Sequence, residues 1–202
     1  MTKEEQLLGW LGNGKPTGRK LIDLEWKISR KGDFYTLENE KVPFTLFLYF
    51  IGNKIVQVKL DTGIETATSP SRERLGTYRT LLIMNSQVAH VKFMIEGINE
   101  NVVARVDMDM QTITKAELDE ALNALLSSLY MMVRALHLEE EFNKQIVDRM
   151  LMLVREMQEE GKSKIEIVDF LKSRMGFREE DAKRIVEEFL SEDLRGNERL
   201  YG

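Results

Sequence analysis

The chain has no cysteine, and its 202 residues include only two histidines and three prolines. Without cysteine it can form no disulfide, thiolate nucleophile or cysteine-ligated metal site. No run approaches the roughly 20 apolar residues that span a bilayer, and the first residues lack the apolar core of a signal peptide. These absences lead us to expect a soluble, cytoplasmic protein with no membrane segment.

The formal net charge of −5 is unevenly distributed. Residues 1–138 carry 17 acidic and 17 basic side chains, whereas residues 139–202 carry 17 acidic and 12 basic ones. Sequence-independent binding to nucleic acid requires a concentrated positive field. A neutral body with an acidic tail therefore argues against nucleic acid as a partner.

The best-patterned stretch runs from Val88 to Leu136. Apolar residues alternate with polar ones over 91–96 and over 102–110, and a glycine-containing turn lies between, which predicts a β-hairpin. Thr114 and Glu117 then have the spacing of a helix capping box. Leucines and methionines follow at steps of three and four up to Leu136, which predicts a long helix with a wide apolar stripe.

Earlier segments complete an α+β pattern. We expect a helix over 2–11, strands over 21–29, 44–51 and 54–60, and an irregular loop over 30–41. Ser69 and Pro70 indicate the start of a second helix over 72–84, with Leu75, Tyr78 and Leu82 on one side, Leu81 flanking them and Asn85 as a stop. The order α-β-β-β-α-β-β-α predicts a mainly antiparallel five-stranded sheet with helices packed on one side.

Over residues 1–138 this element order resembles bacterial type III secretion chaperones of the CesT kind and the related YbjN-like proteins. The run Leu81-Leu82-Ile83-Met84-Asn85, the Val91-Lys92-Phe93 strand and the Leu118 to Leu136 helix carry the resemblance. It implies a commonly dimeric fold, and for the secretion members the binding of extended client segments without nucleotide hydrolysis. The chain differs from a typical secretion chaperone in its greater length.

The added segment, residues 139–202, predicts a small helical bundle. A stripe from Phe142 to Met157 ends at Gly161, and Ser163 and Glu166 have capping-box spacing for a second helix. A third helix is expected over 179–191. The Met175-Gly176-Phe177 loop between two amphipathic helices is similar to the first half of a ubiquitin-associated domain; the alternatives are a structural cap or a platform for another protein.

No set of residues in the sequence has the spacing of a catalytic site. His90 and His137 have no partner in sequence that would make them metal ligands. Asp107 and Asp109 share a strand face, which could hold a metal but also fits cross-strand charge pairing. The Gly9 to Lys15 segment has P-loop spacing but lacks the required hydroxyl, strand and helix. We therefore expect no catalytic residue, cofactor or metal.

Candidate contact residues fall into two groups. Phe47, Tyr49 and Ile55 would form an apolar patch if the second face of the sheet is uncovered. An adaptable methionine surface is the other hypothesis, because thioethers repack easily, although methionine also fills core gaps. The full set of candidate partner-binding residues is Phe47, Tyr49, Ile55, Leu81, Met108, Met110, Met131 and Met132.

The leading functional hypothesis is a non-enzymatic, dimeric protein-binding molecule, either chaperone-like or an adaptor for a client protein. The alternative is a nucleic-acid-associated regulator in which Arg72, Arg74 and Arg79 meet phosphates. A small hydrolase or transferase has the least support.

Overall fold

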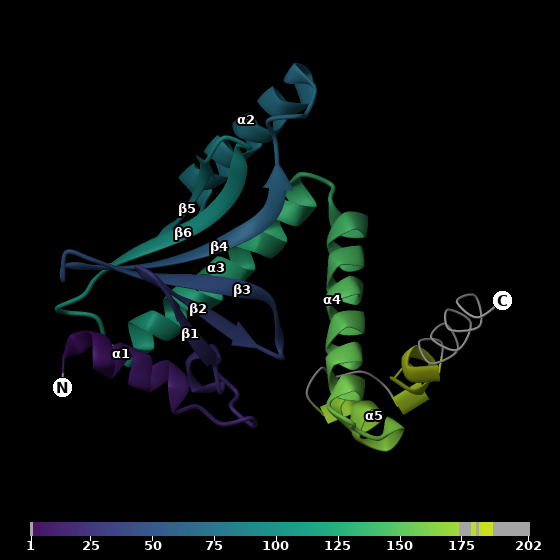
Figure 1. Ribbon diagram of the computed structural model, residues 1–202. Helices are drawn as coiled ribbons and strands as arrows, with labels where there is room; N and C mark the ends of the chain where they lie inside the picture. The colour runs from purple at the N-terminus through teal and green to yellow at the C-terminus, as the bar shows by residue number, and fades with distance from the viewer. Residues whose placement is uncertain (1, 174–178, 181, 188–202) are drawn as a thin grey trace. The chain divides into compact units, whose positions relative to one another are not determined.

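The computed structural model describes residues 2–173, 179–180 and 182–187 (Figure 1). The chain divides into two compact units, Met1–Glu139 and Glu140–Gly202. Among the described residues, no helix is long and apolar enough to cross a membrane.

The first unit is an α+β fold built on one six-stranded sheet (Figure 1). Every neighbouring pair of strands is antiparallel, and their order across the sheet is β1-β2-β3-β4-β6-β5. The fold class is thus confirmed, with six strands in place of five. The elements in chain order are α1 (Lys3–Gly12), a 3₁₀ turn η1 (Leu21–Asp23), β1 (Lys27–Lys31), β2 (Phe34–Asn39), β3 (Val42–Ile51), β4 (Ile55–Glu65), α2 (Ser71–Gln87), β5 (Val91–Glu96), β6 (Asn101–Asp109) and α3 (Lys115–Ala135).

The core lies between the sheet and α3, which crosses behind the sheet in the view of Figure 1. Leu48, Val58 and Val106 project from three adjacent strands on this side, and all are buried. They meet the apolar stripe of α3, whose buried members include Leu122, Leu125 and Leu129. The stripe predicted from the three-and-four spacing is therefore the one that packs on the sheet.

Capping boxes begin both α1 and α3, and the one at α3 is the box predicted from Thr114 and Glu117. The Thr2 hydroxyl accepts from the Glu5 N–H and the Glu5 carboxylate accepts from the Thr2 N–H. Thr114 and Glu117 repeat the arrangement at α3. Each box satisfies amide groups that the first helical turn leaves without partners.

The prediction of a strand over 21–29 followed by a loop over 30–41 is wrong. Leu21–Asp23 forms η1, and residues 27–39 form the β1–β2 hairpin. The two-residue turn at Gly32 and Asp33 accounts for the hairpin, because Gly32 adopts φ +62°. Tertiary contacts account for η1, since the Ile22 N–H donates to the Asp119 carboxylate at 3.0 Å.

The apolar side predicted for α2 is not the side that is buried. Leu81 and Met84 are buried, whereas Leu75 is 66% exposed and Leu82 is 70% exposed. The helix continues past Asn85 to Gln87, and Pro70, not Ser69, is its N-cap. Apolar residues occur all around this helix, so periodicity alone could not select the side that meets β5.

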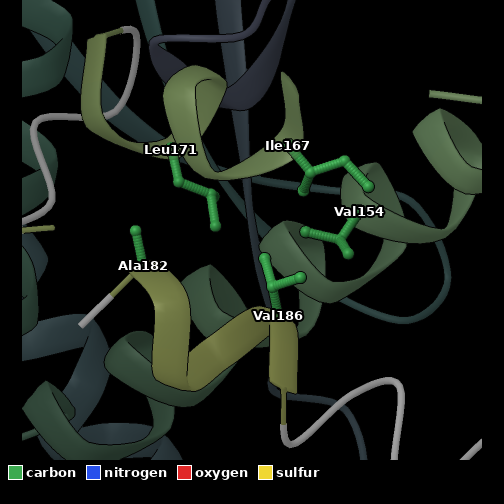
Figure 2. Packing of buried hydrophobic residues seen from close by; sticks show 5 residues of the cluster. All are labelled: Val154, Ile167, Leu171, Ala182 and Val186. Carbon is green, nitrogen blue, oxygen red and sulfur yellow. The ribbon is translucent and has the colours of Figure 1, made fainter. Parts of the chain in front are cut away.

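The second unit contains α4 (Glu139–Glu159) and α5 (Lys164–Ser173). Gly161 with φ +79° follows α4, and the Ser163 and Glu166 capping box precedes α5, both as predicted. Residues 179–180 and 182–187 are helical, while Met175-Gly176-Phe177 and the rest of the predicted third helix lie outside the described residues. Figure 2 shows the core of this unit, made by Val154, Ile167, Leu171, Ala182 and Val186.

Candidate protein-contact surface

The strand register places the three predicted patch residues on one face of the sheet. Tyr49 lies opposite Gln57 and Ile51 lies opposite Ile55, while Phe47 lies two residues along β3 from Tyr49. This is the face opposite the one carrying Leu48 and Val58, because successive side chains alternate between faces. We call it the open face, since no described helix of the first unit packs on it.

An aromatic cluster occupies part of the open face. Phe34 on β2 stacks edge-on against Phe47, with ring centroids 5.8 Å apart, and lies 5.2 Å from the ring of Tyr49. Ile51 and Ile55 continue the apolar surface and are 46% and 39% exposed. We call these five residues, Phe34, Phe47, Tyr49, Ile51 and Ile55, the open-face patch.

Polar side chains border the patch on the side of β4 and β6. The Lys59 ammonium lies 5.0 Å above the Tyr49 ring and 2.8 Å from the Glu96 carboxylate. The Asp107 carboxylate accepts from Gln57 at 2.7 Å and pairs with Arg105 at 2.9 Å. These contacts hold the border side chains in place, so the apolar area ends at β4.

Charge of opposite sign lies at the two sides of the open face. Lys27 and Lys31 project from β1, where they lie opposite Glu38 and Phe34. Asp107 and Asp109 project from β6, and three strands lie between β1 and β6. The margin at β1 carries these two lysines beside Glu38, and the margin at β6 carries the two aspartates beside Arg105; we call them the basic and the acidic margin.

The predicted methionine surface does not form as a unit. Met110 and Met132 are buried, and so is Leu81 on α2. These three residues belong to the core and are not available to a partner. Met108 is half-buried on the helix-covered side of β6, and Met131 is 48% exposed on the outer side of α3. Only Met131 of the predicted methionines is open to solvent.

The residues considered for chemistry have structural roles. Asp109 accepts from the Gln111 N–H at 2.7 Å and so stabilises the turn after β6, while Asp107 is held by Gln57 and Arg105. His90 and His137 adopt positive φ at turns after α2 and α3. Among the described residues, no group of three or more histidine, aspartate or glutamate side chains could hold a metal ion.

Two surface features were missed by the sequence analysis. Phe34 was not predicted as a surface residue because its segment was expected to be a loop. The segment does carry a strand signal, since Phe34, Thr36 and Glu38 alternate with Tyr35, Leu37 and Asn39. The second feature is the outer side of α2, where Leu75 and Leu82 flank Arg72 and Arg79. Arg74, by contrast, is 3.6 Å from the Glu100 carboxylate.

Two family models divide the chain between them. Residues 6–136 match DUF8183, described as a domain of unknown function. Residues 137–201 match HTH_78, which has the same description. No curated protein matches the chain.

Among solved structures, the chain is similar to the Yersinia pestis type III secretion chaperone SycH, with 14% identity over 65% of this chain and 99% of that one, at a TM-score of 0.45. It is also similar to Escherichia coli YbjN, titled a putative transcription regulator, with 15% identity over 57% and 83% of the two chains and a TM-score of 0.42. A third similar structure is an uncharacterized protein from Methanothermobacter thermautotrophicus. It has 10% identity over 70% of this chain and 99% of that one, at a TM-score of 0.49. The first two are of the kinds that the sequence resembles.

Proposed function

This chain belongs to the family described as domain of unknown function DUF8183, and we propose that it is a non-enzymatic protein-binding molecule, chaperone-like or an adaptor, that acts as a homodimer. The open-face patch is the observation that carries the proposal. A contiguous apolar cluster on a sheet face, bordered by charged groups, is typical of a surface that another protein covers.

A second copy of the chain is the partner that best fits the open face. A two-fold axis running along β3 would lay the patch on its own copy and bring β1 of one protomer over β6 of the other. Lys31 would then face Asp107, so the basic margin would meet the acidic margin at both ends of the interface.

The open face is large enough for such an interface. The overlap runs from β1 to β6, and five strands spaced about 4.8 Å apart give it a width of roughly 19 Å. The 10 residues of β3 extend over roughly 34 Å. The overlap of roughly 650 Å² is at the lower end of the roughly 600–1,000 Å² that stable complexes bury on each partner, and two sheets pack face to face about 10 Å apart.

Pairing of the open faces does not use the helix-covered side of the first unit, which we propose as the side that contacts a client protein. Tyr130 and Met131 on α3, about half exposed at 50% and 48%, lie on that side. A dimer built in this way presents two identical client surfaces, which supports an adaptor or chaperone-like role.

Light scattering on the eluate of a size-exclusion column tests the homodimer. Wild type should have the mass of two chains, and the double variant Phe47→Ser plus Tyr49→Ser should dissociate with a dissociation constant at least about 30-fold higher, as expected for central aromatic contacts. Ile98→Ser is the matched control, since Ile98 is 94% exposed in the turn between β5 and β6. A monomeric wild type, or a double variant that stays dimeric, would contradict the proposal.

A nucleic-acid-associated regulator is the second candidate. It is favoured by Arg72 and Arg79, which are exposed on α2 and form no ion pair within the described part of the chain. Retention on immobilised DNA or RNA should then fall with salt and with Arg72→Ala plus Arg79→Ala. Absence of retention at low salt would remove this candidate.

A further inference from the structure

A pocket of about 350 Å³ lies on the helix-covered side of the first unit, away from the open face. Four segments line it: the chain before η1, η1 itself, the beginning of β3 and the second half of α3. Leu24 and Val42 are buried at its base, and Phe44 and Leu126 complete an apolar lining. The pocket is the size of a small ligand site.

The wall of the pocket is built by close backbone packing. A side chain at Gly18 would place its Cβ 2.3 Å from the Asp23 carbonyl oxygen, so only glycine fits there. The Lys15 N–H donates to the same carbonyl oxygen at 2.8 Å. The segment before η1 is therefore fixed against it, and the lining is formed in advance of any ligand.

Side-chain bonds attach η1 to its neighbours. The Trp26 indole donates to the Leu21 carbonyl oxygen at 2.8 Å, and the Asp23 carboxylate lies 2.6 Å from the Lys115 ammonium on α3. The hydrogen bond from Lys115 holds the pKa of Asp23 below its ordinary value. This carboxylate is thus already paired with a cation outside the pocket.

The rim of the pocket is basic. Arg19, Lys20 and Lys41 line it, and no acidic side chain does. Within the described part of the chain, neither Arg19 nor Lys41 forms an ion pair with a carboxylate. An apolar base under unpaired cations is complementary to a ligand with a bulky apolar group and a nearby negative charge.

We propose that this pocket, which we call the α3 pocket, binds an acidic peptide segment of a client, with one large apolar side chain in the pocket and a neighbouring carboxylate on Arg19 and Lys41. The assignment rests on the proposed protein-binding function and names the chemistry of its client. A peptide fits better than a free small molecule because Tyr130, which lines the pocket, is 50% exposed, so a chain can continue past it.

Fluorescence anisotropy with the full chain tests the assignment. Three labelled 12-residue peptides serve as probes: one with a central Leu flanked by Glu in a Ser and Gly background, one with Lys replacing Glu, and one with Ala replacing Leu. The acidic Leu peptide should bind at least about tenfold more tightly than either of the others, since charged hydrogen bonds and a buried leucine each contribute that much. Equal binding of the acidic and basic peptides would overturn the proposal.

Charge reversal locates the site. Arg19→Glu plus Lys41→Glu should reverse the preference, so that the Lys peptide binds more tightly than the Glu peptide. Arg72→Glu plus Lys164→Glu makes the same change in net charge at exposed positions elsewhere and should keep the wild-type preference. If both double variants behave alike, the α3 pocket is not the binding site.

One further measurement separates the pocket proposal from the dimer proposal, and another separates a peptide ligand from a free carboxylate. The Phe47→Ser plus Tyr49→Ser variant should bind the acidic peptide as wild type does even if it is monomeric, so failure of the dimer and failure of the pocket give different results. Decanoate is the second probe. Displacement of the peptide by decanoate at concentrations below the dissociation constant of the peptide would assign the pocket to a free carboxylate and overturn the peptide assignment.

Discussion

The Asn85 carboxamide on α2 pairs with the backbone of Phe93 on β5 as another strand would. It donates to the Phe93 carbonyl oxygen at 3.0 Å and accepts from the Phe93 N–H at 2.7 Å. Because β5 is an outer strand, these two groups would otherwise be open to any passing chain. One side chain therefore fixes α2 to the sheet and closes the middle of this edge.

Asn85→Leu should destabilise the first unit by about 1–3 kcal/mol, because both Phe93 groups lose their partners in a half-buried place. Urea unfolding measures the change. The control is Asn123→Ala, which removes an exposed carboxamide that donates to the Asp119 carbonyl oxygen within α3. If both variants have the stability of wild type, the Asn85 pairing makes no net contribution.

Two glycine substitutions should change the free energy of unfolding in opposite directions. Gly14→Ala would place a Cβ 1.9 Å from the Leu24 carbonyl oxygen and should cost about 3 kcal/mol or more through overpacking against backbone. Gly76→Ala, in the exposed middle of α2 with no atom within 4 Å of the added Cβ, should stabilise by about 0.5–1 kcal/mol. Thermal unfolding measures both changes. If the two variants shift the unfolding temperature equally and in the same direction, the close approach at Gly14 is refuted.

The contribution of the α3 capping box to stability should depend on pH. The backbone N–H and hydroxyl of Thr114 hydrogen-bond the Glu117 carboxylate and lower its pKa below the ordinary glutamate value. Its contribution to stability is therefore complete above the unfolded-state pKa and is lost as pH falls through the lower folded-state pKa.

Carboxyl NMR titration measures this shift directly. Thr114→Ala removes the hydroxyl but keeps the backbone N–H, which is the larger cause, so it should raise the pKa of Glu117 only part of the way toward its ordinary value. Glu166, whose pKa is lowered in the same way by Ser163, is an internal control that should not change. A Glu117 pKa that does not change in the variant would mean that the backbone N–H of residue 114 holds the charge without the hydroxyl.

Lys31→Glu should weaken the homodimer through the margins of the open face, since it places a carboxylate opposite Asp107 of the other protomer. Sedimentation equilibrium should show a dissociation constant raised about tenfold, with a smaller increase at high salt because ions screen the repulsion. Lys164→Glu, an exposed change of the same sign in the second unit, should leave the constant unchanged. Equal effects of the two variants would exclude the β1 to β6 arrangement.

Local signals predicted most helix starts and the hairpins that have clear turns. Thr114 with Glu117, Ser163 with Glu166, and the Gly52-Asn53 turn carry their information within four residues. The Phe47, Tyr49 and Ile55 grouping also followed from sequence, because alternation along β3 and β4 determines which side chains share a face.

Features that depend on distant contacts were not predictable. The segment Leu21-Ile22-Asp23 alternates like a strand, yet bonds to Asp119 and Lys115, almost 100 residues away, hold it as η1. The buried side of α2 depends on where β5 lies. The α3 pocket joins four segments from residue 18 to residue 130, and no local pattern identifies such a meeting point.

Strand β1 forms the other outer edge of the sheet, and this edge is protected by positive charge and not by a side chain that pairs with its backbone. It is only five residues long, with the sequence KISRK, and so places three cations along the edge where a further strand would add. Copies that approach this edge in register repel one another. With β1 repelling other copies and β5 closed by Asn85, growth into long polymers by edge-to-edge addition is disfavoured, which leaves the faces of the sheet for association.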